Sequence, residues 1–163
     1  MSRTLLLMRH AQAGDGHGVT DHERPLTDLG REQAERVGKV LAELGHVPDH
    51  VICSTAERTR RTLDGVLGAM DPGVRAGLTV DYSETAYLAG VDQLWELVNQ
   101  VDADADTVLV VGHNPTIAQV AASLVGHEAL TAFLPATVAE VDLEVEWLYA
   151  AAGTGTGRLL DRM

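Results

Sequence analysis

The stretch Leu5–Ala11 reads LLLMRHA: four apolar residues, then an arginine, a histidine and a small residue. A short, continuous apolar run is typical of a strand that is buried on both faces, as in a parallel sheet covered by helices. The run Thr107–Val111, TVLVV, has the same character and leads into Gly112–Pro115, GHNP. Two buried strands that each deliver a histidine at their carboxyl end therefore predict an α/β fold with functional residues at the strand ends.

The remaining apolar residues alternate between strand-like runs and helical spacing. Leu63, Val66, Leu67 and Met70 are spaced 0, 3, 4, 7, which indicates the buried face of a helix. Similar patterns predict strands over His50–Ser54 and Leu78–Tyr82 and helices whose buried faces run over Ala34–Leu44, Val91–Val98 and Ile117–Leu124.

The C-terminal part has a different pattern. From Val141 to Tyr149 apolar and acidic residues alternate, which predicts one or two antiparallel strands with one exposed face. Gly153–Gly157 is expected to be flexible. Strands that alternate with helices imply a three-layer α/β/α fold with a mostly parallel central sheet, and the length of 163 residues, without a repeat or linker, predicts a single domain over residues 1–163.

The overall charge restricts the function. Twelve Lys and Arg against 24 Asp and Glu give a net charge of −12, which argues against binding of nucleic acid or of anionic lipid surfaces. The longest apolar runs fall well short of the roughly 18 residues of a membrane span, and the N-terminal run is too short for a signal peptide. With Cys53 as its single cysteine, the chain is expected in a reducing compartment, the cytoplasm.

The predicted strand ends bring together histidines and arginines. The first strand delivers Arg9 and His10, the second leads into a helix with Arg58, and Thr107–Val111 delivers His113. A positive pocket in an acidic body suits a small dianion such as a phosphoryl group, and a neutral imidazole can attack phosphorus. Because the sequence shows neither a P-loop nor a metal-carboxylate cluster, a covalent route without metal or cofactor is the simplest chemistry.

Four segments resemble a known family. Leu5–Ala11 resembles the strand-plus-Arg-His signature of the histidine phosphatase superfamily. Arg24–Gly30, RPLTDLG, resembles a stretch common in its small members, Ser54–Thr62 its second arginine segment, and Val110–Pro115 the segment of its second catalytic histidine. The segments occur in family order, and the short chain is most similar to the SixA-like phosphohistidine phosphatase branch. The resemblance implies a phosphoglycerate mutase-like fold.

The resemblance also implies residue roles. It makes His10 the nucleophile that forms a transient phosphohistidine, with Arg9 and Arg58 as ligands of the phosphoryl oxygens and His113 as the stabiliser of the transferring charge. Arg24 is an additional candidate for substrate or phosphate binding. Glu84 is the best-placed candidate for the general acid, both by the resemblance and because it follows the predicted third strand.

Several alternatives remain open. The favoured substrate is a protein phosphohistidine; a small phosphomonoester and a phosphate-binding module without turnover are the alternatives. A mutase is least favoured, because the chain lacks a cap and carries Gln12 and Ala13 where mutases have a glutamate; Ala11 also replaces the usual glycine. The oligomeric state is left open.

The other polar candidates are expected in ordinary structural roles: Arg60 and Arg61 on a solvated helix face, His17 and His22 in a solvated loop, His46, His50 and His127 at the surface or in packing, Cys53 in the core, and Asp102, Asp104 and Asp106 in a solvated turn.

Overall fold

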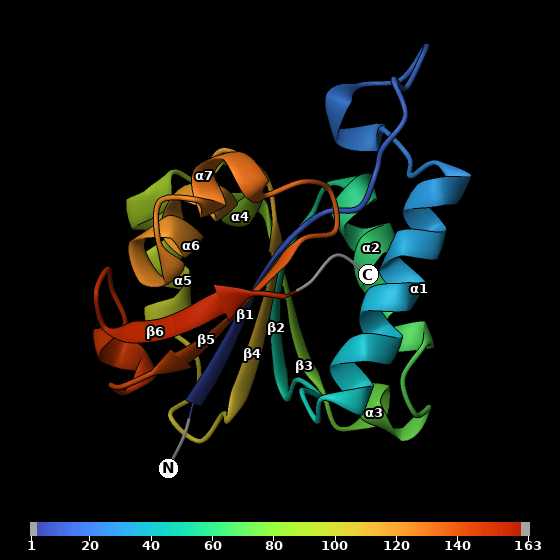
Figure 1. Cartoon of the computed structure of the whole chain (residues 1–163). Coiled ribbons are helices and arrows are strands. Elements are labelled where there is room, and N and C mark those ends of the chain that lie inside the picture. Colours follow the sequence, from blue (N-terminus) through green and yellow to red (C-terminus); the bar gives the residue numbers. More distant parts are fainter. Residues whose placement is uncertain (1–2, 161–163) are drawn as a thin grey trace.

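The computed structural model, which describes residues 3–160, has a six-stranded sheet as its middle layer (Figure 1). The strand order is β3-β2-β4-β1-β5-β6. The first four strands in this order are parallel, whereas β5 pairs antiparallel with both β1 and β6. The prediction of a mostly parallel α/β sheet is confirmed. The strands are β1 (Arg3–Arg9), β2 (His50–Ser54), β3 (Thr79–Ser83), β4 (Thr107–Gly112), β5 (Val138–Leu143) and β6 (Gly155–Leu159).

Helices cover both faces of the sheet. On one face, α1 and α2 pack on Leu6 and Met8 of β1; on the other, α5 and α6 pack on Leu5 and Leu7. Successive residues of a strand point to opposite faces, so the continuous run LLLM supplies both cores at once. The helices are α1 (Asp28–Glu43), α2 (Glu57–Gly68), α3 (Gly73–Ala76), α4 (Glu84–Leu88), α5 (Val91–Asn99), α6 (Thr116–Val125) and α7 (Ala129–Ala132), with 3₁₀ turns η1 (Asp21–Glu23) and η2 (Trp147–Tyr149).

The C-terminal predictions need correction. The alternating pattern of Val141–Tyr149 predicts one or two antiparallel strands, but β5 ends at Leu143 and Trp147–Tyr149 forms η2. The indole of Trp147 is buried, and its Nε1–H donates to the carbonyl of Ala105 at 2.7 Å. The alternation beyond Leu143 therefore does not mark a sheet face, because a buried hydrogen bond turns Trp147 into the core.

The expectation of flexibility at Gly153–Gly157 is also wrong for most of that segment. Gly155 opens β6 and pairs with Leu143, while Gly157 pairs with Val141. A Cβ atom on Gly157 would lie 2.0 Å from the carbonyl oxygen of Glu140. Here glycine allows two strands to approach closely, which is a common reason for a glycine within a strand.

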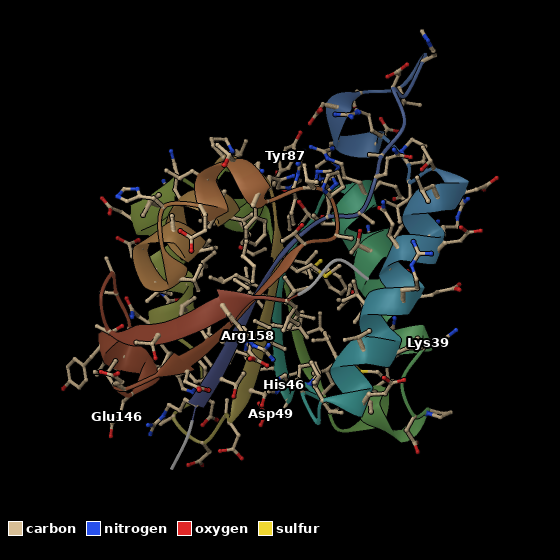
Figure 2. The ribbon with its side chains drawn as sticks, viewed as in Figure 1. Lys39, His46, Asp49, Tyr87, Glu146 and Arg158 are labelled. Atoms are coloured by element: carbon tan, nitrogen blue, oxygen red, sulfur yellow. The ribbon has the colours of Figure 1, made fainter. Side chains whose placement is uncertain are left out.

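Two smaller features complete the fold. Leu44, which was expected on the buried face of the first helix, is the C-cap of α1 and 44% exposed, because the helix ends there. The half-buried His46 contacts the carboxylate of Glu140, which also accepts from Arg158 Nε at 3.1 Å. Figure 2 shows His46 and Asp49 at the opposite end of the molecule from Tyr87. Within residues 3–160, every helix is too short or too polar to cross a membrane.

Candidate active site

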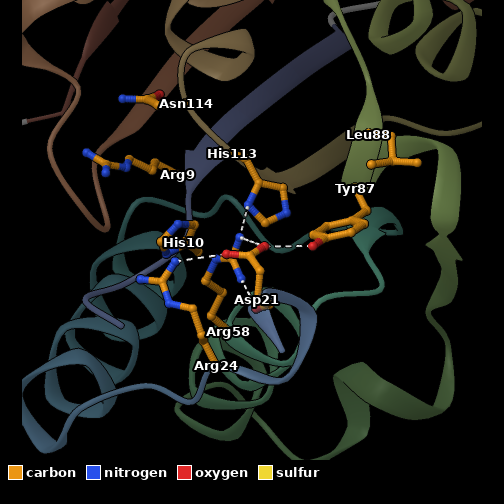
Figure 3. Close-up of a pocket in the computed structure, with 9 residues that line it drawn as sticks. All are labelled: Arg9, His10, Asp21, Arg24, Arg58, Tyr87, Leu88, His113 and Asn114. Carbon is orange, nitrogen blue, oxygen red and sulfur yellow. Dashed lines mark hydrogen bonds and ion pairs between the residues drawn. The ribbon is translucent and has the colours of Figure 1, made fainter. Parts of the chain in front are cut away.

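A pocket of about 450 Å³ opens at the carboxyl ends of β1 and β4 (Figure 3). Since Arg9 and Gly112 are register partners in the parallel β1–β4 pair, the residues that follow them, His10 and His113, lie side by side. Their ring centroids are 5.4 Å apart. Nine residues line the pocket: Arg9, His10, Asp21, Arg24, Arg58, Tyr87, Leu88, His113 and Asn114.

His10 is held in one tautomer at the closed end of the pocket. Its Nδ1 lies 2.7 Å from the carbonyl oxygen of Ala11. A carbonyl only accepts, so Nδ1 carries the proton and the lone pair of Nε2 is free. Burial, followed by the charges of Arg58 and Arg9, lowers the pKa of His10 to about 4. The ring is therefore neutral at pH 7, as a nitrogen nucleophile must be.

His113 is neutral for similar reasons but has the opposite tautomer. Its Nδ1 lies 3.4 Å from Nη2 of Arg58, which only donates, so Nδ1 is the acceptor. Its Nε2–H then donates to Oγ of Ser54 at 2.8 Å. Burial, and next the charge of Arg58, lowers the pKa of His113 to about 3.

Two guanidinium groups flank the histidines. Arg58, which α2 projects into the pocket, is 7% exposed and donates from Nη1 to the carbonyl oxygen of Asp21 at 2.8 Å. Arg9 donates from Nη1 to the carbonyl oxygen of Phe133 at 3.1 Å. The Nε–H groups of both arginines are buried without an acceptor in the described part of the chain. The predicted set Arg9, His10, Arg58 and His113 is thus brought together in one pocket.

Arg24 also lines the pocket, and the structure adds four residues that the sequence analysis did not single out, foremost Asp21. Arg24 Nε donates to the carbonyl of Gly14 at 3.0 Å, and its Nη1 donates to Asp21 Oδ1 at 3.1 Å. Asp21 sits in η1, where the Arg24 N–H donates to its carbonyl at 3.2 Å. The only sequence signal for Asp21 is its position three residues before Arg24. Asn114 follows His113 in the segment GHNP at a strand end, whereas Tyr87 and Leu88 have no such signal.

Glu84 lies outside the pocket lining. It is the first residue of α4, is exposed, and accepts a hydrogen bond from Thr55 Oγ1 at 2.8 Å. Because the threonine proton is used there, His22 Nε2–H must be the donor in its 2.9 Å contact with Thr55. The His22 ring packs edge-on against Tyr87, with centroids 4.8 Å apart. Glu84 is three residues before the pocket residue Tyr87 in α4, but its carboxylate bonds to Thr55 and does not line the pocket.

Other expected residues are accounted for outside the pocket. Arg60 and Arg61 are exposed, and Arg61 pairs with Glu57 at 2.6 Å, which agrees with a solvated helix face. His17 is exposed as expected, but the half-buried and hydrogen-bonded His22 is not a solvated loop residue, because Thr55 and Tyr87 enclose it. Cys53 is buried in β2. In residues 3–160 no three His, Cys, Asp or Glu side chains are grouped as metal ligands.

Comparison with known proteins agrees with this geometry. The sequence profile of the histidine phosphatase superfamily (branch 1) matches residues 5–89. An uncharacterized protein of Mycobacterium tuberculosis is 38% identical over 128 residues, which are 77% of this chain and 76% of that protein. This chain belongs to the histidine phosphatase superfamily.

Solved structures of this superfamily match nearly the whole chain. One, from Nakamurella multipartitia, bears the provisional name phosphohistidine phosphatase SixA; it is 36% identical with a TM-score of 0.80, over 98% of this chain and 94% of its own. A second, from Agrobacterium tumefaciens and with the same provisional name, is 27% identical with a TM-score of 0.76, over 87% of this chain and 92% of its own. The chain is therefore a phosphatase with a phosphoglycerate mutase-like fold, in the SixA-like branch of the histidine phosphatase superfamily.

Proposed function

We propose that this histidine phosphatase hydrolyses protein phosphohistidine through a covalent phosphoryl intermediate on His10, without a metal. The observation that carries the proposal is the hydrogen bond from His10 Nδ1 to the carbonyl of Ala11. It leaves the Nε2 lone pair of a neutral ring free at the closed end of a pocket lined by Arg9, Arg58 and His113. A nucleophilic imidazole next to two guanidinium groups suits transfer of a phosphoryl group.

The steps follow from these positions. His10 Nε2 forms a bond to phosphorus while the bond to the leaving group breaks, and the leaving group takes that electron pair. Arg9 and Arg58 stabilise the charge on the equatorial phosphoryl oxygens. His113 stabilises that charge when its Nε2–H turns from Oγ of Ser54 to a phosphoryl oxygen. Water then attacks the phosphorus of the intermediate, which releases inorganic phosphate and regenerates neutral His10.

The choice of phosphohistidine rests on the leaving group and on the relatives. An alkoxide leaving group needs a proton from a general acid, whereas an imidazole that is already protonated leaves as a neutral molecule. The carboxylate of Glu84, the candidate for that acid, accepts a hydrogen bond from Thr55 and does not line the pocket. The Nakamurella and Agrobacterium proteins carry the provisional name phosphohistidine phosphatase. A phosphorylated protein is thus the proposed partner, and the cytoplasm is the setting we propose for a chain whose one cysteine is buried.

Phosphate release tests this proposal. Wild type and His10→Ala, both with EDTA, receive a phosphohistidine-bearing protein or para-nitrophenyl phosphate. We expect release from the phosphoprotein by wild type and a loss of at least about 10³-fold in His10→Ala, because the nucleophile is gone. His127→Ala, which removes an exposed histidine outside the pocket, should retain wild-type activity. Preference for the ester would favour a small phosphomonoester as substrate, and phosphate binding without release would contradict turnover.

A further inference from the structure

The carboxylate of Asp21 lies inside a pocket that is otherwise suited to an anion. It accepts hydrogen bonds from Tyr87 Oη at 2.6 Å, from Arg24 Nη1 at 3.1 Å and from Arg58 Nη2 at 3.2 Å. Figure 3 shows this carboxylate between Arg58 and Tyr87, facing the guanidinium groups. Asp21 therefore offsets part of the positive charge that a phosphoryl dianion would meet.

Asp21 lies at the end of the pocket through which a leaving group must depart. His10 and Arg58 are 9% and 7% exposed and form the closed end, whereas the side chain of Asp21 is 54% exposed and Leu88 is 73% exposed. In an in-line displacement the leaving group lies opposite the nucleophile. With His10 at the closed end, the leaving group is therefore on the open side, which Asp21, Tyr87 and Leu88 line.

The hydrogen bonds of Asp21 determine what it can do for a leaving group. The Tyr87 hydroxyl, and next the Arg24 guanidinium, hold the pKa of this carboxyl well below its usual range. At neutral pH Asp21 has no proton to give to an alkoxide, so it is unsuited to the general-acid step that ester cleavage needs. A fixed carboxylate does stabilise a positively charged N–H donor.

We propose that Asp21 selects substrates whose leaving group is a protonated nitrogen ring, by accepting the N–H of that ring at the open side of the pocket. This role rests on the proposed phosphohistidine activity. In the step, His10 Nε2 bonds to phosphorus as the P–N bond breaks, and the electron pair of that bond stays on the departing ring nitrogen. The other ring nitrogen keeps its proton and donates it in a hydrogen bond to the carboxylate of Asp21. The cationic ring therefore leaves as neutral imidazole, and no proton is transferred.

A pair of small substrates isolates this role. Phosphoimidazole and phenyl phosphate carry the same phosphoryl group on rings of similar size, but only the imidazole ring offers a charged N–H. We expect Asp21→Asn to lower kcat/KM for phosphoimidazole about tenfold or more, because a charge-assisted hydrogen bond is lost. For phenyl phosphate, which offers Asp21 no N–H, any loss should be several times smaller, so the ratio of kcat/KM for phosphoimidazole to that for phenyl phosphate should fall.

The matched control is Glu23→Gln. Glu23 lies in the same 3₁₀ turn, outside the pocket lining, and accepts from Thr20 Oγ1 at 2.8 Å, a bond that glutamine can keep. This variant removes the same charge from the same segment, and the ratio of the two kcat/KM values should remain that of wild type. A ratio that falls equally in Glu23→Gln would show a general charge effect and would overturn the assignment to Asp21.

Inorganic phosphate gives a second, independent measurement. Since Asp21 occupies donors of Arg24 and Arg58, phosphate should inhibit Asp21→Asn severalfold more strongly than wild type. Equal loss of kcat/KM for both substrates with weaker phosphate inhibition would mean that Asp21 only orients Arg58, and would overturn the proposal. A wild type that hydrolyses phenyl phosphate but not phosphoimidazole would instead contradict the proposed function itself, so the two failures are distinguishable.

Discussion

At the scale of single residues, backbone carbonyls and guanidinium groups set the state of the two pocket histidines. The carbonyl of Ala11 fixes the proton of His10 on Nδ1, and Arg58 fixes the acceptor of His113 on Nδ1. Both rings are buried enough that their neutral form is favoured. The sequence could place these residues at strand ends, but their tautomers depend on contacts made only in the folded chain.

Burial of neutral histidine makes stability depend on pH. The pKa of His10 is about 4 in the folded protein and about 6.5 in the unfolded chain, so between these values the unfolded chain binds more protons. The stability that neutral His10 contributes is fully present above pH 6.5 and is lost as the pH falls toward 4. We expect wild type to lose stability between pH 7 and pH 4.5, and His10→Gln to lose about 2 kcal/mol less.

Urea unfolding at both pH values measures this difference. His127→Gln, which removes an exposed histidine outside the pocket, controls for the loss of a histidine as such. An equal loss of stability on acidification in wild type and His10→Gln would show that His10 is not buried in its neutral form.

At the scale of elements, glycines set how closely α1 and α2 approach. A Cβ atom on Gly38 of α1 would lie 2.2 Å from the carbonyl oxygen of Val66 in α2, a backbone atom that cannot rotate away. A Cβ atom on Gly65 of α2 would lie 2.7 Å from the Cβ of Ala34. Arg58, which reaches the pocket, lies at the other end of α2, in its first turn.

Gly38→Ala should therefore separate the two helices and destabilise the protein by about 1–3 kcal/mol, as overpacking in a core does. Gly68→Ala is the matched control. Gly68 is the exposed last residue of α2, and nothing lies within 4 Å of the added Cβ. There we expect a gain of up to about 1 kcal/mol from helix propensity. Denaturant unfolding of both variants measures the two effects, and similar values for the two would contradict the close contact.

At the scale of the whole molecule, the two faces of the sheet have different tasks. The α1–α2 face connects to the pocket through Arg58, whereas the other face buries Trp147 and joins the C-terminal segment to α5. Asn99 Nδ2 donates to the carbonyls of Trp147 at 2.8 Å and Ala150 at 2.9 Å. These bonds hold η2 against the end of α5, away from the pocket lining.

Trp147→Phe should separate stability from activity. The variant leaves the carbonyl of Ala105 without its indole donor and should lower the free energy of unfolding by about 1–3 kcal/mol. Its kcat/KM for the phosphatase reaction, measured well below the melting temperature, should equal that of wild type. Tyr149→Phe, at an exposed neighbouring position, should change neither quantity. Loss of activity in Trp147→Phe at a temperature where it is folded would show coupling between the two faces.

The sequence by itself determined the parallel core and the histidines and arginines of the pocket. An apolar run buried on both faces has a local signature, and the ends of parallel strands meet at one edge of a sheet. The sequence did not predict β6, because its glycines suggested a flexible segment. In the structure these glycines allow close contact with β5.

Only the tertiary structure decided the open side of the pocket. Asp21 and Tyr87 are 66 residues apart, and no periodicity relates them, yet their side chains share a 2.6 Å hydrogen bond. Likewise Glu84 follows its strand as expected, but its carboxylate bonds to Thr55 and lies outside the pocket lining. The physical reason is that loops are positioned by the packing beneath them: a local pattern shows where a loop starts, but not which distant side chain it meets.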